Sequence, residues 1–365
     1  MGLKSKDYLI SKLGNNFPVI KYFEALETEQ FKHYAEEDLL KINDASDGDY
    51  FFGHHASFIQ NYSNSGQYWL GIEAWLSLLD IVKKINPNKY KIIHKGTPYY
   101  MAGIFCLLEK KYEEGLEFID FALSQDFKIH RRKALTTPSG LYLLIAHPQC
   151  GNDSTQGEYL FNAINNFGNF INKTYRIQLD IIKLMKIISK KVLLCRERAR
   201  RSAWASLLSQ ILSFEGNARI LRIAPLSKEN QTLAHLSLVK MSLILETLLK
   251  KSPISKRTNS HKTLNGNTYS VYNHPKLTLD KIYYDLNIEV DSILESSLKT
   301  FDYKKINRLI RIEHVSSQKS SFLISRFIRN NVNHTFQNTM ISEKAYKKLF
   351  VTLFNSQLYC LQSFY

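Results

Sequence analysis

The residues best suited to chemistry in this chain are Arg329, Asn330 and His334, which stand in the string Arg-Asn-Asn-Val-Asn-His. A histidine imidazole exchanges protons near neutral pH, because its unperturbed pKa is about 6.5. An arginine guanidinium binds a phosphate with a fixed fork of donors and stabilises the charge that builds up during a reaction. RNA carries its own nucleophile in the 2′-hydroxyl. These residue types are therefore suited to cutting RNA without a metal.

The separation of Arg329 and His334 limits how they can cooperate. On a regular helix, positions five apart point about 140° away from each other, so the two side chains would not share a face. Two arrangements remain open. In the first, the segment is irregular and a helix begins at or just after it, which the three asparagines favour, so that free N–H groups face a phosphate. In the second, two subunits place their pairs side by side across a two-fold axis.

Helical periodicity surrounds this string. The expected helices are 233–249, 279–298, 304–328 with a break near Ser316-Ser317, and 342–361. Four helices in this order predict a bundle. The segment at about 252–275 is rich in Lys, Ser, Asn, Thr and Gly, which predicts an exposed, mobile insert.

A sequence pattern recurs in the N-terminal half at a spacing of 44 residues. Self-similarity at such a period is typical of stacked helical hairpins. The second copy resembles a tetratricopeptide repeat, with Tyr99, Ala102 and Gly103 in its first helix, but it departs at Cys106 and Phe127, where an aromatic residue and a proline are usual. The alternative is a pair of amphipathic helices with an apolar face. The recurring residues are Tyr68, Gly71, Trp75 and Leu78 in the first copy, and Tyr112, Gly115, Ile119 and Ala122 in the second.

The C-terminal string carries a second resemblance. The order Arg329, Asn330, three residues and His334, after a helix and inside a predicted bundle, resembles the HEPN family of ribonucleases, over roughly residue 231 to the C-terminus. The resemblance implies that Arg329 and His334 are catalytic, that Asn330 supports them, and that a homodimer brings two motifs into one cleft. It also implies a metal-independent endoribonuclease without a cofactor, of the kind that serves bacterial toxin or phage-defence systems.

One departure from the family bears on regulation. In HEPN toxins that a nucleotidyltransferase silences, a tyrosine two residues after the histidine accepts the nucleotide, whereas Phe336 stands here and has no hydroxyl. We therefore expect control by the N-terminal helical domain or by a protein partner that docks on it.

The charge of the chain favours an anionic partner. It carries 49 Lys and Arg against 33 Asp and Glu, a formal net charge of +16, and such a field attracts polyanions. RNA is the first candidate and a membrane surface the second, and any single arginine in a charge run is more often part of a solvated helix face. Glu246 is expected either to orient Arg329 or His334, or to be a partly buried acid that pairs with a basic neighbour. The residues predicted to bind RNA besides the motif are Arg326, Lys319, Arg196, Arg198, Arg200 and Arg201.

These observations predict an all-α protein with a tetratricopeptide-like helical domain at 1–225 and a HEPN-like bundle at 226–365. No uncharged run of eighteen apolar residues and no signal core are present, which predicts a cytoplasmic protein without a transmembrane helix. The four cysteines stand singly, so we expect no metal site. The alternative function is a non-catalytic helical-repeat protein that dimerises and binds protein or nucleic acid.

Overall fold

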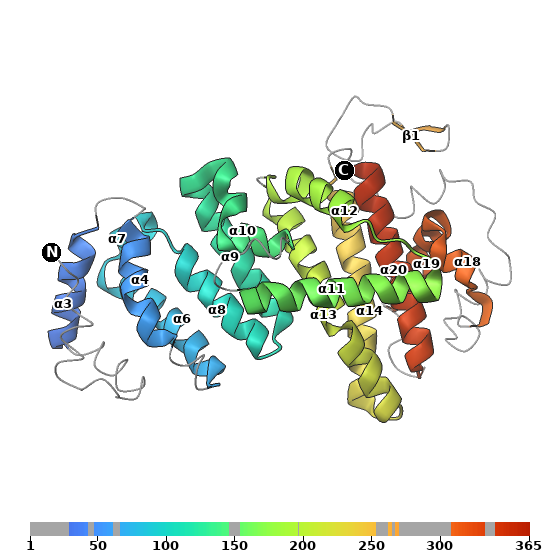
Figure 1. The fold of residues 1–365 in the computed structure, drawn as a ribbon, viewed down its shortest axis with the longest axis horizontal. Helices are drawn as coiled ribbons and strands as arrows, with labels where there is room; N and C mark the ends of the chain where they lie inside the picture. Colours follow the sequence, from blue (N-terminus) through green and yellow to red (C-terminus); the bar gives the residue numbers. More distant parts are fainter. Residues whose placement is uncertain are drawn as a thin grey trace. The chain divides into compact units, whose positions relative to one another are not determined.

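The computed structural model describes residues 29–42, 47–60, 66–145, 154–195, 197–252, 262–264, 267–269, 308–332 and 340–365. In these ranges the regular structure is helical except for one hairpin, in which β1 (Lys262–Leu264) pairs antiparallel with β2 (Asn267–Tyr269) (Figure 1). The predicted all-α class is therefore confirmed. The hairpin lies inside the predicted insert at about 252–275, where no strand was predicted.

The chain divides into two compact units, Met1–Gly157 and Glu158–Tyr365. A domain boundary was predicted near residue 225 instead. That position lies in a short turn between α13 (Arg198–Ile223) and α14 (Lys228–Lys250). These two helices pack against each other within the second unit. Pro225 therefore belongs to an interhelical turn, because the buried faces of the helices on either side of it meet.

In the first unit, the central element is α8, which packs against both α6 and α9. The helices α3 and α4 pack against α6, and α10 packs against α9. The elements of this unit are α3 (Glu29–Leu40), α4 (Asp47–Ile59), α6 (Tyr68–Ile85), α7 (Pro87–Ile92), α8 (Gly96–Leu108), α9 (Tyr112–His130), the 3₁₀-helix η1 (Arg131–Thr136) and α10 (Pro138–Leu143).

The recurring sequence pattern marks two helix starts, since α6 begins at Tyr68 and α9 begins at Tyr112. Between α8 and α9 the chain turns at Lys110, which has a positive φ of 61°. There Lys110 N–H donates to Leu107 O and Lys111 N–H donates to Cys106 O, which is the Schellman arrangement that satisfies the last carbonyls of a helix. The helices of both copies are confirmed, and the tetratricopeptide arrangement stays a prediction.

Two glycines allow α8 and α9 to approach closely. A Cβ atom added at Gly103 would stand 2.8 Å from the backbone oxygen of Gly115. A Cβ atom added at Gly115 would stand 2.9 Å from the backbone oxygen of Gly103. Since backbone atoms cannot move aside as a flexible side chain can, both positions require glycine at this helix spacing.

We expect Gly103→Ala to lower the free energy of unfolding of the first unit by about 1–3 kcal/mol, because the added methyl group forces α8 away from α9. The matched control is Gly53→Ala in α4, where an added Cβ meets nothing within 4 Å. That change should stabilise the helix by up to about 1 kcal/mol. Urea unfolding checks both variants, and equal stability of the two would contradict the close approach.

A buried polar network fixes the end of α9 to the segments on either side of it. His94 Nε2 lies 2.9 Å from Oδ1 of Asp126, and the hydroxyls of Thr137 and Ser139 both donate to Oδ2 at 2.5 Å. His94, Asp126 and Ser139 are all buried. Both oxygens of the carboxylate are thus satisfied, as the burial of a charged group requires.

The second unit is built around α20, which is buried from Leu349 through Leu361. It packs against α13, α14 and α19. The elements of this unit are α11 (Ser154–Tyr175), whose first turn precedes Glu158, α12 (Ile181–Ile187), the π-helix η3 (Ile188–Leu193), α13, α14, β1, β2, α18 (Ile312–Ser316), α19 (Gln318–Val332) and α20 (Glu343–Phe364).

Aromatic rings join helices from distant parts of the sequence in this unit. Phe167 of α11 meets Phe354 of α20 with ring centres 4.9 Å apart, and Phe214 of α13 meets Phe350 at 4.7 Å. Burial of side chains of this size contributes about 2–3 kcal/mol each. The contact surface therefore holds α11, α13 and α20 together.

The helices that surround the Arg-Asn motif agree with the predicted ones where the structure describes them. The predicted stretches 233–249 and 342–361 lie in α14 and α20, and the predicted break falls between α18 and α19 at Ser317. The predicted helix 279–298 lies outside the described residues. In the described ranges, α14 is the one helix long and apolar enough to cross a membrane, and 56% of that window is buried in the structure.

Candidate functional site

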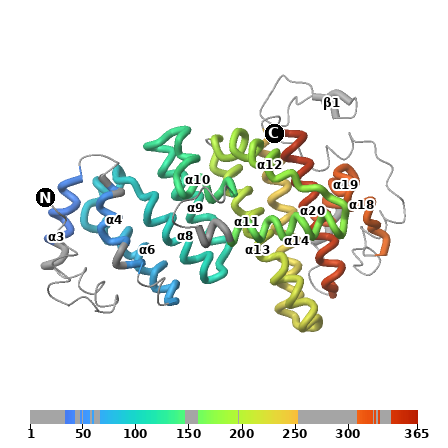
Figure 2. The backbone as a smooth tube through the Cα atoms, viewed as in Figure 1, coloured from blue at the N-terminus to red at the C-terminus, as the bar shows by residue number. Residues whose placement is uncertain are grey.

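The helix α19 positions Arg329 through the residues that precede it. Phe322, Ser325 and Ile328 are buried at intervals of three residues, which places them along one face of the helix. This face packs against α20, where Phe322 meets Tyr359 with ring centres 5.7 Å apart and the hydroxyl of Ser325 lies 2.6 Å from that of Ser356. Arg329 directly follows Ile328 in the last turn of the helix. Figure 2 shows α19 and α20 as neighbouring helices.

The guanidinium of Arg329 is held by Glu246 of α14. Its Nη2 donates to both carboxylate oxygens of Glu246 at 3.2 Å. The Nζ of Lys250, one turn further along α14, lies 2.6 Å from Glu246 Oε1. The side chain of Arg329 is 33% exposed and that of Glu246 is 14% exposed. Glu246 therefore anchors Arg329, whose side chain is partly exposed.

The electrostatic balance of these three groups favours an anion. Burial acts to raise the pKa of Glu246, but the hydrogen bond from Lys250 and the charge of Arg329 outweigh it, so that the pKa lies below its ordinary value. Glu246 is therefore ionised at neutral pH. One carboxylate between two cations leaves the group with one net positive charge. Both alternatives for Glu246 are present, since the carboxylate pairs with its basic neighbour Lys250 and also contacts Arg329.

The described part of the motif, Arg329 to Val332, lies at a helix end, and not at a helix start; the alternative start just after His334 falls outside the described residues. The helix α19 continues through Asn330 and Asn331 to Val332, and the next helix of the described chain begins at Glu343. Asparagine has a low helix propensity, but the packed face that ends at Ile328 stabilises the turn that follows, so tertiary contacts override the local preference. A cation in the last turn also interacts favourably with the negative end of the helix dipole.

The other motif residues are described only in part. Asn330 belongs to α19, but its side chain is outside the described residues, as is that of Arg326. His334 lies in 333–339, which is also outside them. Lys319 is exposed in the first turn of α19. Arg329 is therefore the one motif residue with a described side chain.

The predicted arginine cluster does not form a single exposed patch. Arg198 is exposed, and Arg196 lies outside the described residues. Arg200 and Arg201 are buried. The Nε of Arg200 donates to the backbone oxygen of Lys251 at 2.5 Å, and Arg201 Nη1 donates to that of Cys195 at 3.0 Å.

The prediction that Arg200 and Arg201 contact RNA is corrected accordingly. Their guanidinium groups hold the start of α13 to neighbouring chain segments, and the Arg200 guanidinium also lies 5.4 Å from the ring centre of Tyr365. The run of charges in the sequence could not reveal this, because the oxygen of Lys251 comes from beyond the end of α14.

Two basic features of the structure were not identified from the sequence. Lys250 stands four residues after Glu246 on one helix, a spacing at which opposite charges pair. A second group gathers at the start of α20, where Lys344, Lys347 and Lys348 recur at helical spacing and line a pocket with Arg308 and Arg311. The helical spacing of the three lysines could have been recognised in the sequence.

Comparison with protein-family models, with curated proteins and with solved structures finds no match to this chain.

Proposed function

We propose that the chain is a metal-independent endoribonuclease that uses Arg329, Asn330 and His334, acts as a homodimer through its HEPN-like bundle, and serves as a toxin or phage-defence effector. The observation that carries the proposal is the anchoring of Arg329 by Glu246, on packed helices, with the Arg329 side chain partly exposed. A functional arginine needs this kind of support, because its reach and direction must be set before the substrate binds. The net charge of +16 supports a polyanionic substrate.

The proposed reaction is an internal transfer of the phosphodiester. The 2′-hydroxyl loses its proton to a base, its oxygen attacks the phosphorus, and the bond to the 5′-oxygen breaks as that oxygen takes up a proton. His334 moves these protons, and in a dimer the two copies of His334 divide the roles of base and acid. Arg329 binds the scissile phosphate and stabilises its developing charge. Asn330 orients the phosphate or a neighbouring side chain by a hydrogen bond.

The first unit is the proposed site of regulation. It is a separate compact unit of packed helices, and Phe336 offers no hydroxyl for modification. A protein partner bound to this unit would control access of RNA to the second unit. The proposed setting of the reaction is the cytoplasm, where RNA substrates are present.

The chemistry of the products tests the proposal. The purified protein is incubated in EDTA with synthetic single-stranded RNAs of random sequence, and with the same RNAs methylated at every 2′-hydroxyl. We expect fragments with 2′,3′-cyclic phosphate and 5′-hydroxyl ends from the first set and no fragments from the second. Cleavage of both sets, or of neither, would reject the proposed reaction, and the latter would favour the non-catalytic interaction protein.

The variant Glu246→Gln tests whether Glu246 positions Arg329 for the reaction or only stabilises the fold. The amide keeps the size of the side chain but no longer holds Arg329 by charge, so kcat should fall about tenfold. The KM for RNA should stay equal or decrease, because removal of a carboxylate makes the site more positive. Steady-state cleavage assays measure both constants. The control is Glu229→Gln, a fully exposed acid on the same helix, and a fall in kcat with a rise in KM for Glu246→Gln would contradict the positioning role.

A further inference from the structure

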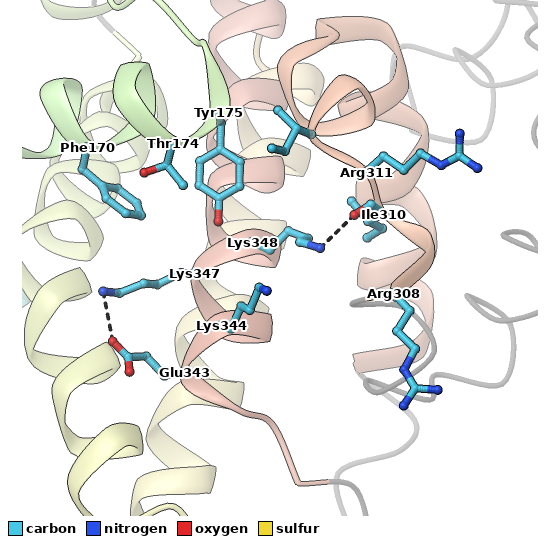
Figure 3. Close-up of a pocket in the computed structure, with 11 residues that line it drawn as sticks. Phe170, Thr174, Tyr175, Arg308, Ile310, Arg311, Glu343, Lys344, Lys347 and Lys348 are labelled. Atoms are coloured by element: carbon cyan, nitrogen blue, oxygen red, sulfur yellow. Dashed lines mark hydrogen bonds and ion pairs between the residues drawn. The ribbon is translucent and has the colours of Figure 1, made fainter.

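A pocket of about 500 Å³ opens in the second unit between the end of α11, the segment that leads into α18 and the first two turns of α20. Figure 3 shows its walls: Phe170 and Tyr175 come from α11, and Lys344 and Lys348 come from α20. Neither Glu246 nor Arg329 lines it. The pocket is therefore separate from the ion pair of Glu246 with Arg329, and its volume is in the range of about 300–1,000 Å³ that small-molecule sites occupy.

The lining carries an unbalanced positive charge. Five cations and one carboxylate, that of Glu343, line the pocket, which gives a net charge of +4. The carboxylate is engaged by Lys347, whose Nζ lies 3.1 Å from Glu343 Oε1. Within the described part of the chain, Lys344 and the guanidinium groups of Arg308 and Arg311 take part in no ion pair. Like charges that lie close together repel each other, and a bound anion would offset this repulsion.

The cations come from two walls of the pocket: Lys344, Lys347 and Lys348 from α20, and Arg308 and Arg311 from the segment that leads into α18. In Figure 3 Lys344 and Lys348 extend from α20 into the space, with the ammonium group of Lys348 directed at the oxygen of Ile310 and the hydroxyl of Tyr175 on the side of α11. The Nζ of Lys348 donates to the backbone oxygen of Ile310 at 2.8 Å, which fixes its position. Burial, and then the charge of Lys344, lower the pKa of Lys348. The charges of the two lysines therefore act on each other within the same part of the pocket.

The opposite part of the lining is apolar and aromatic. Tyr175 and Ile310 are buried, and the Nζ of Lys347 lies 5.4 Å from the ring centre of Phe170. Aromatic rings next to cations bind flat ligands by stacking and by contact with apolar surface. A ligand that satisfies both halves of the pocket carries at least two negative charges at one end and a flat, weakly polar group at the other.

We propose that this pocket binds a nucleoside phosphate, with its phosphate groups on Lys344 and Lys348 and its base against the rings of Phe170 and Tyr175. Arg308 and Arg311 come from the facing wall, and their exposed guanidinium groups, which point away from the two lysines, add positive charge to the surroundings of the pocket. The same chemistry is offered by a free nucleotide and by a nucleotide within an RNA chain. The inference does not depend on cleavage of RNA, because binding is measured in the absence of any reaction.

Isothermal titration calorimetry of the full chain with ATP, adenosine and inorganic phosphate tests the proposal. We expect saturable binding of ATP. The affinities for adenosine and for phosphate should be weaker than that for ATP by about 10-fold or more, since each offers half of the contacts. Lys344→Glu should weaken ATP binding about 10- to 100-fold, because a charge-assisted contact becomes a repulsive one. Arg219→Glu, an exposed charge reversal on α13 outside the pocket, should leave it unchanged.

The outcomes separate the possibilities. Absence of ATP binding, or equal loss in Lys344→Glu and Arg219→Glu, would overturn the proposal. Competition with single-stranded RNA distinguishes the two sources of the ligand. Loss of ATP binding in the presence of RNA, together with weaker RNA binding by Lys344→Glu, assigns the pocket to a nucleotide of the RNA chain, whereas ATP binding that RNA does not reduce assigns it to a free nucleotide.

Discussion

Replacement of Arg329 by alanine should lower the rate of RNA cleavage by about 10²- to 10³-fold, because a preorganised donor to the phosphate is lost. Folding should be affected little, since the side chain is 33% exposed and its ion pair with Glu246 is not deeply buried. Arg329→Lys should recover only part of the rate: it retains the charge but lacks the planar fork that binds two phosphate oxygens.

The matched control is Arg219→Ala, which removes an exposed arginine from α13 of the same unit. Initial rates of cleavage of a labelled RNA, measured at equal concentrations of folded protein, give the comparison. A wild-type rate for Arg329→Ala would show that Arg329 takes no part in the reaction. Equal losses in both variants would show that general attraction of RNA, and not a specific contact, governs the rate.

Asp126→Asn should be the most destabilising of the changes considered, with a loss of about 2–4 kcal/mol in the free energy of unfolding of the first unit. The carboxylate accepts hydrogen bonds on both oxygens, from His94 on one side and from Thr137 and Ser139 on the other. An amide presents an NH₂ group on one side, where it meets another donor. The packing of α9 against α10 then lacks its polar link.

The effect has a defined pH dependence. Burial acts to raise the pKa of Asp126, but the hydrogen bonds from His94, Ser139 and Thr137 outweigh it and lower the pKa below its ordinary value. The stabilisation is therefore fully present above the pKa of an unfolded aspartate, about 3.9, and is lost as the pH falls through the lowered folded-state pKa. The difference between wild type and Asp126→Asn should be constant near neutral pH and shrink under acid conditions.

Tryptophan fluorescence can report this unit separately. In a Trp204→Phe background, the two remaining tryptophans, Trp69 and Trp75, both lie in α6. Urea unfolding is followed from pH 7 downward, with Asp80→Asn as the control, since Asp80 is 55% exposed and pairs with Lys84 on the same helix. That control should cost less than about 1 kcal/mol. A difference between wild type and Asp126→Asn that grows on acidification would contradict the assigned role.

The sequence predicted the helices well where local pattern determines them. Apolar periodicity located α14 and α20, and the recurring tyrosines stand at the starts of α6 and α9. The two compact units divide at Gly157, whereas the domain boundary was predicted at Pro225, because a proline has the same local signature in a tight turn as in a linker. The contact of Phe167 with Phe354, which joins α11 to the bundle, is between residues too distant in sequence for periodicity to reveal.

The site was predictable in its residue types and less so in its geometry. The pairing of Glu246 with Arg329 was among the predicted alternatives and is present. A helix start at Arg329 to Val332 was wrong, because low asparagine propensity was outweighed by the packing that ends at Ile328. Burial of Arg200 depends on a carbonyl of Lys251, a contact between separate segments that a run of charges does not encode.

The most direct test of the proposed ribonuclease is the initial rate of RNA cleavage in EDTA by wild type and by His334→Ala, each shown to be folded by its unfolding transition. The proposal predicts metal-independent cleavage by the wild type and a rate about 10²- to 10⁴-fold lower without the imidazole, since proton transfer by a positioned side chain contributes about this factor. Equal rates for the two proteins, or wild-type cleavage that requires a divalent metal, would contradict it.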